Sequence, residues 1–111
     1  ASINATLGSG MIPIYSAAKG AIISLVRSMA DELAEDGVRI NAISPGQIDT
    51  PIIAAVKAAR PGYFERRIML GRFGDPAEIA TTIRFLLSNE ASYITAAQIV
   101  VDGGNINSSR Q

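Results

Sequence analysis

The feature that most restricts the fold is a long helical pattern that changes into a strand pattern within a residue or two. Apolar side chains recur at helical spacing over residues 14–36, which predicts a single amphipathic helix. The members of this stripe are Ile22, Leu25, Val26, Met29 and Leu33. Gly37 follows as a helix-ending residue, and residues 38–44 then favour a short strand that stops at Pro45 and Gly46. So short a connection is typical of α/β folds.

The same order of helix and strand returns in the second half of the chain. Asp75, Pro76 and Glu78 are the cap, the first-turn proline and the capping-box acid of a helix over residues 76–87. The expected buried face of this helix holds Ile79, Ile83, Leu86 and Leu87. Residues 98–102 form an apolar run that is typical of a strand covered on both faces of a parallel sheet.

The other segments have no strong pattern. We expect a loop over residues 1–13, and residues 54–60 and 64–70 are candidates for short helices. With 111 residues and neither repeat nor linker, residues 1–111 are expected to form one α/β unit.

Composition narrows the possible functions. Ten basic and ten acidic residues balance, so nothing indicates binding to nucleic acid or to a membrane surface, and no apolar run reaches the length of a membrane span. The absence of Cys excludes disulfides and thiolate metal sites, and it suits a cytoplasmic protein. The absence of His removes the usual general base and the commonest metal ligand, so we expect no metal site.

Tyr15 and Lys19 are the candidate catalytic pair. Residues at i and i+4 share one face of a helix, with Cβ atoms ~5–6 Å apart. An ammonium group near a phenol favours the phenolate, which suits a tyrosine that acts as a general acid or base near neutral pH. By itself the pair is weak evidence, because Tyr and Lys at this spacing also occur on solvated helices.

Five ordered features make the signal specific. They are Ser2, with twelve residues between it and the tyrosine; YSAAKGAI at 15–22; DGVRINAISPGQIDTP at 36–51; GRFGDPAEIA at 71–80; and ITAAQIVVDGG at 94–104. In these features the chain resembles the short-chain dehydrogenase/reductase family over essentially its whole length. The resemblance implies an α/β fold that is the C-terminal part of a doubly wound, parallel, Rossmann-like sheet.

The resemblance also implies an oxidoreductase that interconverts a small-molecule secondary alcohol and a ketone with NAD or NADP. By this resemblance, Tyr15 exchanges a proton with the substrate oxygen, Lys19 tunes Tyr15 and holds the cofactor ribose, and Ser2 hydrogen-bonds to the substrate oxygen. The other residues expected at the cofactor are Pro45, Gly46, Ile48 and Thr50, with the Ile48 backbone and the Thr50 side chain facing the nicotinamide carboxamide. The alternatives are a local hydrogen-bonding role for Ser2 and a plain loop role for Thr50.

Some residues carry lesser expectations. Asn41 is expected to be structural, residues 102–104 to form a turn, and residues 8–10 not to bind phosphate, because the strand–turn–helix setting is missing. Ala96 replaces the family's usual glycine and is expected to strain the backbone mildly. An apolar pocket is suggested, although a core or an interface would fit equally, by Met11, Ile12, Ile14, Ile52 and Ile53.

The family's N-terminal half, with its glycine-rich pyrophosphate turn, has no counterpart in this sequence, which also begins without Met. We therefore expect a piece of a longer enzyme that is inactive alone and, by resemblance, homo-oligomeric through the helices at 14–36 and 76–87. The alternative function is a non-catalytic module that binds a partner through a face of small residues, namely Ala17, Ala21, Ser24 and Ser28.

Overall fold

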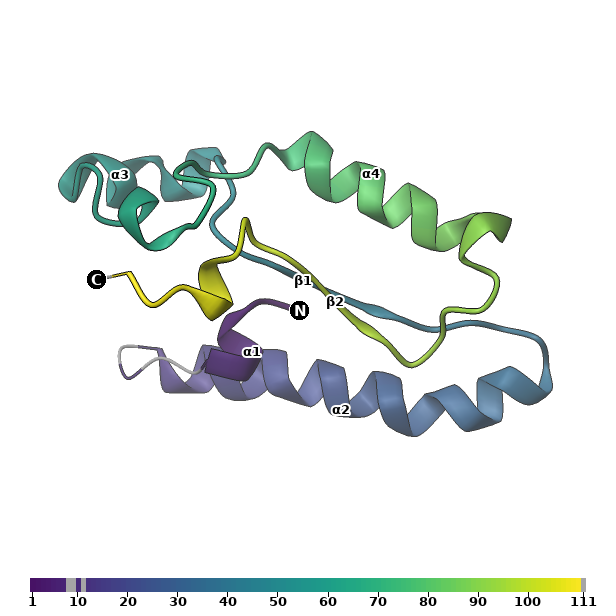
Figure 1. The fold of residues 1–111 in the computed structure, drawn as a ribbon. Coiled ribbons are helices and arrows are strands. Elements are labelled where there is room, and N and C mark those ends of the chain that lie inside the picture. Colours follow the sequence, from purple (N-terminus) through teal and green to yellow (C-terminus); the bar gives the residue numbers. More distant parts are fainter. Residues whose placement is uncertain (8–9, 11, 111) are drawn as a thin grey trace.

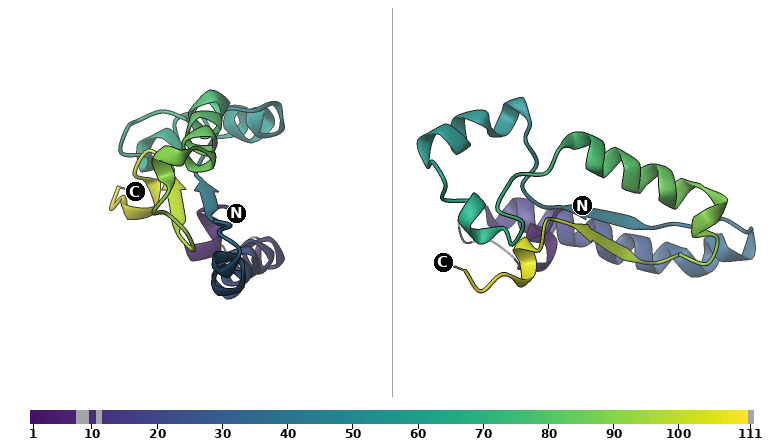
Figure 2. Two further views of the ribbon diagram at one scale, coloured as in Figure 1. Left: turned by 90° about the vertical axis from the view of Figure 1, so that its right-hand side faces the viewer. Right: turned by 45° about the horizontal axis from the view of Figure 1, so that its top comes forward.

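Two strands lie between helices on opposite sides in the computed structural model, which describes residues 1–7, 10 and 12–110 (Figure 1). β1 (Ala42–Pro45) and β2 (Gln98–Val101) pair in parallel. In the end-on view of Figure 2, α2 (Pro13–Glu35) and α4 (Pro76–Leu87) lie on opposite sides of the strands. The predicted α/β arrangement with a parallel sheet is therefore confirmed.

Shorter elements connect these parts. They are α1 (Asn4–Leu7), α3 (Pro51–Ala59) and three single 3₁₀ turns, η1 (Glu65–Arg67), η2 (Asn89–Ala91) and η3 (Asn105–Asn107). Within the described residues, no helix is both long and apolar enough to cross a membrane.

The ends of the two long helices follow the sequence signals. Gly37 has φ +70° and donates its N–H to the Ala34 carbonyl (3.0 Å), while the Val38 N–H bonds to the Leu33 carbonyl (2.9 Å). This pair of bonds is a Schellman cap, and it needs the left-handed conformation that glycine adopts without strain. At the start of α4, the Asp75 side chain accepts from Ala77 N–H as part of a complete capping box.

The buried face of α2 differs from the predicted stripe. Ile23, Val26 and Ala30 are buried, whereas Leu25 is 57% exposed, and Ile22 and Met29 are also exposed. Ile23 and Val26 of this helix cluster with Ala42 of β1, and Ala1, Ala5 and Ile40 pack against the cluster. The neighbouring elements cover only part of the apolar side of α2. The buried residues are displaced by about one position from the predicted stripe.

The helix α4 shows the same effect, because of its four predicted core residues only Leu86 is buried. Ile83 and Leu87 stay exposed, and Ile79 is half-buried. In β2, Val100 is exposed and its neighbours are half-buried, so the expected cover on both faces is incomplete.

The loop predicted over residues 1–13 is wrong at its start, where α1 forms one helical turn. The Asn4 N–H donates to Ser2 Oγ (3.2 Å) and the Leu7 N–H to the Ile3 carbonyl (3.0 Å). A serine two residues before the accepted N–H is a helix cap, which is the local hydrogen-bonding role given above as the alternative for Ser2.

The first strand is shorter than predicted and includes Pro45. The N–H groups of Ala42 and Gly46 point to the β2 side, where they bond to the carbonyls of residues 97 and 101. Because backbone groups alternate along a strand, the missing N–H of Pro45 faces the other side. There the Ile3 N–H bonds to the Pro45 carbonyl (3.1 Å), so the proline breaks no hydrogen bond between the strands.

Candidate active site

The candidate site lies beside the carboxyl end of β1, where open α/β sheets bind their ligands. A cavity of about 420 Å³ is bounded by Ser2, Tyr15, Gly46, Ile48 and Thr50, among others. These five residues were all assigned to the site from the sequence, and they come from the start of the chain, from α2 and from the segment after β1. Of the remaining predicted site residues, Lys19 lies next to Tyr15, and Pro45 precedes the cavity at the end of β1.

Tyr15 and Lys19 lie together in the first turns of α2. The Lys19 Nζ is 5.2 Å from the centroid of the Tyr15 ring, which places the ammonium group over the ring face. Tyr15 is 44% exposed and its side chain borders the cavity. The helix therefore presents a phenol to the cavity and keeps a positive charge beside it.

Ser2 combines a local bond with a place on the cavity wall. Ser2 is buried, and its Oγ accepts a hydrogen bond from the Asn4 N–H at 3.2 Å. A serine hydroxyl that accepts one hydrogen bond still has its own hydrogen to donate. The local capping role that we considered as the alternative is thus present, and it does not prevent donation to a ligand in the cavity.

The segment after β1 supplies backbone and hydroxyl groups. Ile48 pairs with Gly74 in an isolated parallel bridge, in which Gly74 bonds to the flanking Gln47 and Asp49. The N–H and C=O of Ile48 itself therefore point away from Gly74. Thr50 is the N-cap residue of α3, and its side chain makes no capping hydrogen bond, so its hydroxyl is not used by the helix.

Gly46 is required by packing. A Cβ atom at this position would lie 2.5 Å from the Asp102 Cβ and 2.8 Å from its Cα. No side chain fits at that separation, so β1 and the residue after β2 can approach only because residue 46 is glycine.

Apolar side chains form the rest of the cavity wall. Three of the residues suggested from the sequence are among them, namely Ile12, Ile52 and Ile53, together with Ile3, Val56 and Phe64, which the sequence did not single out. Ile14 is 82% exposed and is not part of the wall, and Met11, like Gly8 and Ser9, lies outside the described residues. Val56 and Phe64 fall in the two segments predicted as short helices, where no spacing signal connects them to Tyr15.

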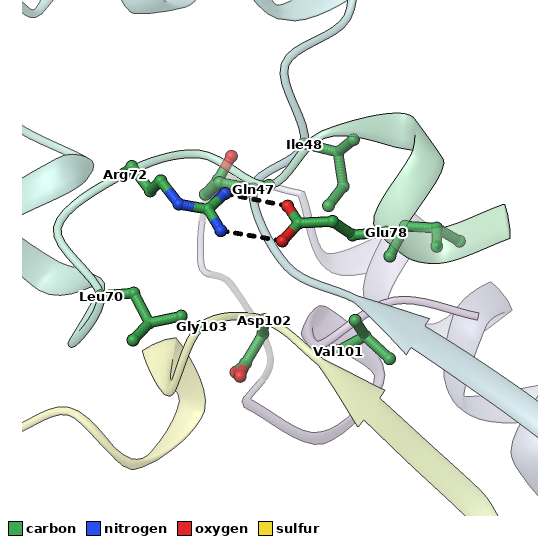
Figure 3. Close-up of a pocket in the computed structure, with 10 residues that line it drawn as sticks. Gln47, Ile48, Leu70, Arg72, Glu78, Val101, Asp102 and Gly103 are labelled. Atoms are coloured by element: carbon green, nitrogen blue, oxygen red, sulfur yellow. Dashed lines mark hydrogen bonds and ion pairs between the residues drawn. The ribbon is translucent and has the colours of Figure 1, made fainter. Parts of the chain in front are cut away.

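A second, smaller cavity of about 120 Å³ lies near Gln47 and Ile48 and is lined mainly by other elements (Figure 3). Its charged groups bind each other: both oxygens of Glu78 accept from the Arg72 guanidinium, at 2.8 and 2.9 Å. The bond from Arg72, together with the Asp75 N–H, lowers the pKa of Glu78 from its usual 4.5 to about 2. Asp102 points away from this ion pair, and its carboxylate accepts the N–H groups of Gly104 and Ile106.

The residues with lesser expectations have structural surroundings. The Asn41 side chain donates to the Ile94 carbonyl and accepts the Ala97 N–H, which connects β1 to the chain before β2. Gly103 and Gly104 have φ +62° and +84°, as a turn requires. Ala96 has φ +57°, the conformation in which glycine would be unstrained. In the described residues, no group of acidic side chains is arranged to hold a metal ion.

Comparisons with known proteins identify the family. A family model described as enoyl-(acyl carrier protein) reductase matches residues 1–105. A short-chain type dehydrogenase/reductase from Mycobacterium ulcerans superposes with a TM-score of 0.92 at 34% identity, over 97% of this chain and 40% of that one. The chain belongs to the short-chain dehydrogenase/reductase family.

Two further relatives bear on the chemistry. The cyclohexanol dehydrogenase of Acinetobacter sp. (strain SE19) is 42% identical over 103 residues, which are 93% of this chain and 40% of that protein. A crystal structure from Agrobacterium tumefaciens with bound NADP matches at a TM-score of 0.90 and 38% identity, over 96% of this chain and 44% of that one. Family membership and the NADP-bound neighbour support NAD or NADP as the cofactor. The chain spans less than half the length of these relatives, and it matches their C-terminal, Rossmann-like part.

Proposed function

We propose that this chain is the catalytic half of a longer oxidoreductase that interconverts a secondary alcohol and a ketone, with Tyr15 as general acid and base. The observation that carries the proposal is the single cavity that collects Ser2, Tyr15 and Thr50, with the Lys19 ammonium over the phenol ring. Each of the three has a hydroxyl, and at least those of Ser2 and Thr50 retain hydrogen-bonding capacity.

The groups around the cavity fit the nicotinamide end of NAD or NADP. The Thr50 hydroxyl and the outward-facing N–H and C=O of Ile48 offer both donors and acceptors, which is what a carboxamide requires. The rest of such a cofactor needs a pyrophosphate site, and no glycine-rich turn of that kind is found in this sequence. We therefore expect the chain alone to be inactive and the activity to belong to the longer protein.

The chemistry divides between the cofactor and three side chains. A bound NAD(P)⁺ would accept the hydride in oxidation, and NAD(P)H would donate it in reduction. Tyr15 would take up the alcohol's hydroxyl proton as the ketone forms and return it in the reverse direction. Ser2 donates a hydrogen bond to the substrate oxygen and stabilises the negative charge that develops there. Lys19 keeps a positive charge over the ring of Tyr15. No histidine is needed, because the phenol moves the proton.

Replacing Tyr15 by Phe tests the proposal. In the full-length protein Tyr15→Phe removes only a hydroxyl group, so the fold and the affinity for NAD(P)H should change little while turnover falls by ~10²-fold or more. Tyr93→Phe is the matched control, because Tyr93 is fully exposed and lies outside the cavity. A Tyr15→Phe enzyme with turnover close to that of Tyr93→Phe would show that the assignment is wrong.

We further propose that the protein is a cytoplasmic homo-oligomer that uses α2 and α4. The small residues of α2 are all exposed, which would let another helix approach closely; they are Ala17, Ala21, Ser24 and Ser28. Ala21→Arg should therefore dissociate the oligomer, measured by sedimentation at micromolar concentration. A monomeric wild type would contradict the proposal.

The non-catalytic alternative uses the same face of α2 to bind a different protein. It would gain support if Ala21→Arg abolished binding of such a partner while Tyr15→Phe had no effect on any activity.

A further inference from the structure

The wall of the large cavity limits which alcohols can approach Tyr15. Its apolar part consists of Ile3, Ile12, Ile52, Ile53, Val56 and Phe64. Among the described residues that line the cavity, none carries a charge. Besides the hydroxyls assigned to the reacting oxygen and the nicotinamide, the polar side chains of this wall are the uncharged amides of Asn4 and Gln47. Most of the wall that the substrate's other atoms meet is therefore hydrocarbon.

We infer that the substrate is an uncharged, apolar ketone or secondary alcohol, and that Phe64 and Val56 determine this preference. The inference rests on the proposed function, which it extends from a reaction type to a substrate class. A sugar or polyol, or an alcohol that carries a carboxylate, is the class that this wall disfavours.

The nearest cation on α3 is already engaged elsewhere. Lys57 forms an ion pair with Asp49 at 2.9 Å, and its Nζ lies 4.6 Å from the centroid of the Phe73 ring. Lys19 lies over the ring of Tyr15. A substrate carboxylate in the cavity would therefore lose water without gaining a free positive partner, which is unfavourable.

Phe64 is held in place by an aromatic cluster. Its ring meets those of Tyr63 and Phe73 edge to face, with centroids 5.1 and 6.1 Å apart, and Phe73 is buried. The guanidinium of Arg67 lies 3.8 Å from the Tyr63 centroid and covers that ring. Because the neighbouring rings fix it, Phe64 is a rigid part of the wall, and substrate shape must adapt to it.

The size of the effect follows from unpaired polar groups. A buried hydroxyl without a partner costs ~1–3 kcal/mol, which corresponds to a factor of ~5–150 in kcat/KM. A carboxylate costs more. We therefore expect discrimination of at least ~10-fold against both a polyol and a carboxylate.

The test measures kcat/KM of the full-length protein, with NAD and with NADP, for three alcohols. Cyclohexanol is the apolar probe, cis-4-hydroxycyclohexanecarboxylate adds one carboxylate to the same ring, and ribitol is a polyol. Cyclohexanol should exceed both others by ~10-fold or more. If either of the others is used as well or better, and Tyr15→Phe abolishes that turnover, the substrate inference falls while the proposed function stands.

Absence of turnover with all three alcohols would contradict the proposed function, and a binding measurement then decides the inference separately. Saturation-transfer NMR of the protein with cofactor should detect cyclohexanone in preference to cyclohexanecarboxylate. Equal or stronger binding of the carboxylate would overturn the inference.

A change of charge at the wall sharpens the test. Val56→Lys places a cation on the half-exposed wall position of α3, and it should raise the ratio of kcat/KM for the carboxylate over cyclohexanol by ~10-fold. Ile52→Lys repeats the change at a more exposed wall position. Ala58→Lys is the control, because Ala58 is exposed on the same helix but is not part of the cavity wall. The same ratio in all three variants would contradict the role of the wall.

Discussion

The two cavities near Gln47 and Ile48 differ in how their polar groups are used. In the smaller one, Glu78 receives two hydrogen bonds from Arg72 and one from the Asp75 N–H, so the charges satisfy each other. In the larger one, the hydroxyls of Ser2 and Thr50 retain hydrogen-bonding capacity and face an apolar wall.

This difference shows why charge by itself is a poor guide to function. The Arg72–Glu78 pair is the more conspicuous feature, yet its geometry caps and anchors the start of α4. The larger cavity has no charged side chain in its described wall, and it can still support proton transfer because its polar groups are free to bind a ligand. Three substitutions separate the two cavities experimentally.

The largest effect is expected where the two cavities share a wall, at the contact between Gly46 and Asp102. Gly46→Ala introduces a Cβ 2.5 Å from the Asp102 Cβ, so the backbone must move. We expect a loss of ~1–3 kcal/mol in the free energy of unfolding. We also expect a fall of ~10²-fold in kcat/KM, because a displacement near 1 Å misplaces the reacting groups.

Gly20→Ala is the matched control for this change. Gly20 lies inside α2, and an added Cβ would meet only the Ala5 carbonyl, at an ordinary 3.6 Å. Alanine is the better helix former, so stability should rise by ~0.5–1 kcal/mol. Chemical denaturation of the two variants measures the contrast, and a Gly46→Ala protein as stable as the wild type would show that this wall is not tightly packed.

Features that depend on residues close together in the sequence could be predicted, and features that depend on tertiary packing could not. Gly37, Asp75 and Glu78 act on backbone groups within a few residues, so their caps could be predicted directly. Ser2 and Tyr15 could be placed at one site only through the spacing of the family motif. Phe64 could not, because tertiary packing around Phe73 brings it to the cavity.

Burial was the least predictable property. Ile22 and Ile23 are chemically the same, but the second packs with Ala42 of β1 and the residues around it, so it is buried while the first is exposed. Periodicity identifies a helix with an apolar side, but it does not say how wide a surface the neighbouring elements cover. For the same reason Leu87 was predicted in the core of α4 and is 79% exposed.

An intermediate effect is expected in the larger cavity alone. Two lysines lie over aromatic rings, Lys19 over Tyr15 and Lys57 over Phe73. Lys19→Ala should lower kcat/KM by ~10–100-fold and weaken cofactor binding, because it removes the charge beside the phenol. Lys57→Ala removes an exposed ion pair with Asp49 and should change kcat/KM by less than ~3-fold. Equal losses in the two variants would contradict the role given to Lys19.

The smallest effect is expected in the smaller cavity, and it depends on pH. The bond from Arg72 lowers the pKa of Glu78 to about 2 in the folded protein, from its usual 4.5. A carboxylate with a lowered folded-state pKa stabilises the protein above its unfolded pKa, and this stabilisation is lost as the pH falls through the lower value. The contribution of Glu78 should therefore be complete above about pH 4.5 and disappear between pH 4.5 and about 2.

Glu78→Gln isolates this contribution, because the amide can still accept the Asp75 N–H but cannot carry the charge that binds Arg72. At pH 7 the variant should be slightly less stable than the wild type, and the difference should shrink toward zero as the pH approaches 2. Glu90→Gln changes an exposed carboxylate that does not line the smaller cavity, and it controls for the general loss of one negative charge.

The activity of Glu78→Gln toward alcohols should equal that of the wild type at pH 7, since only the ion pair that anchors the start of α4 is weakened. A large loss of activity without a loss of stability would mean that the smaller cavity takes part in function. The difference between polar groups that bind each other and polar groups that remain available would then no longer distinguish the two cavities.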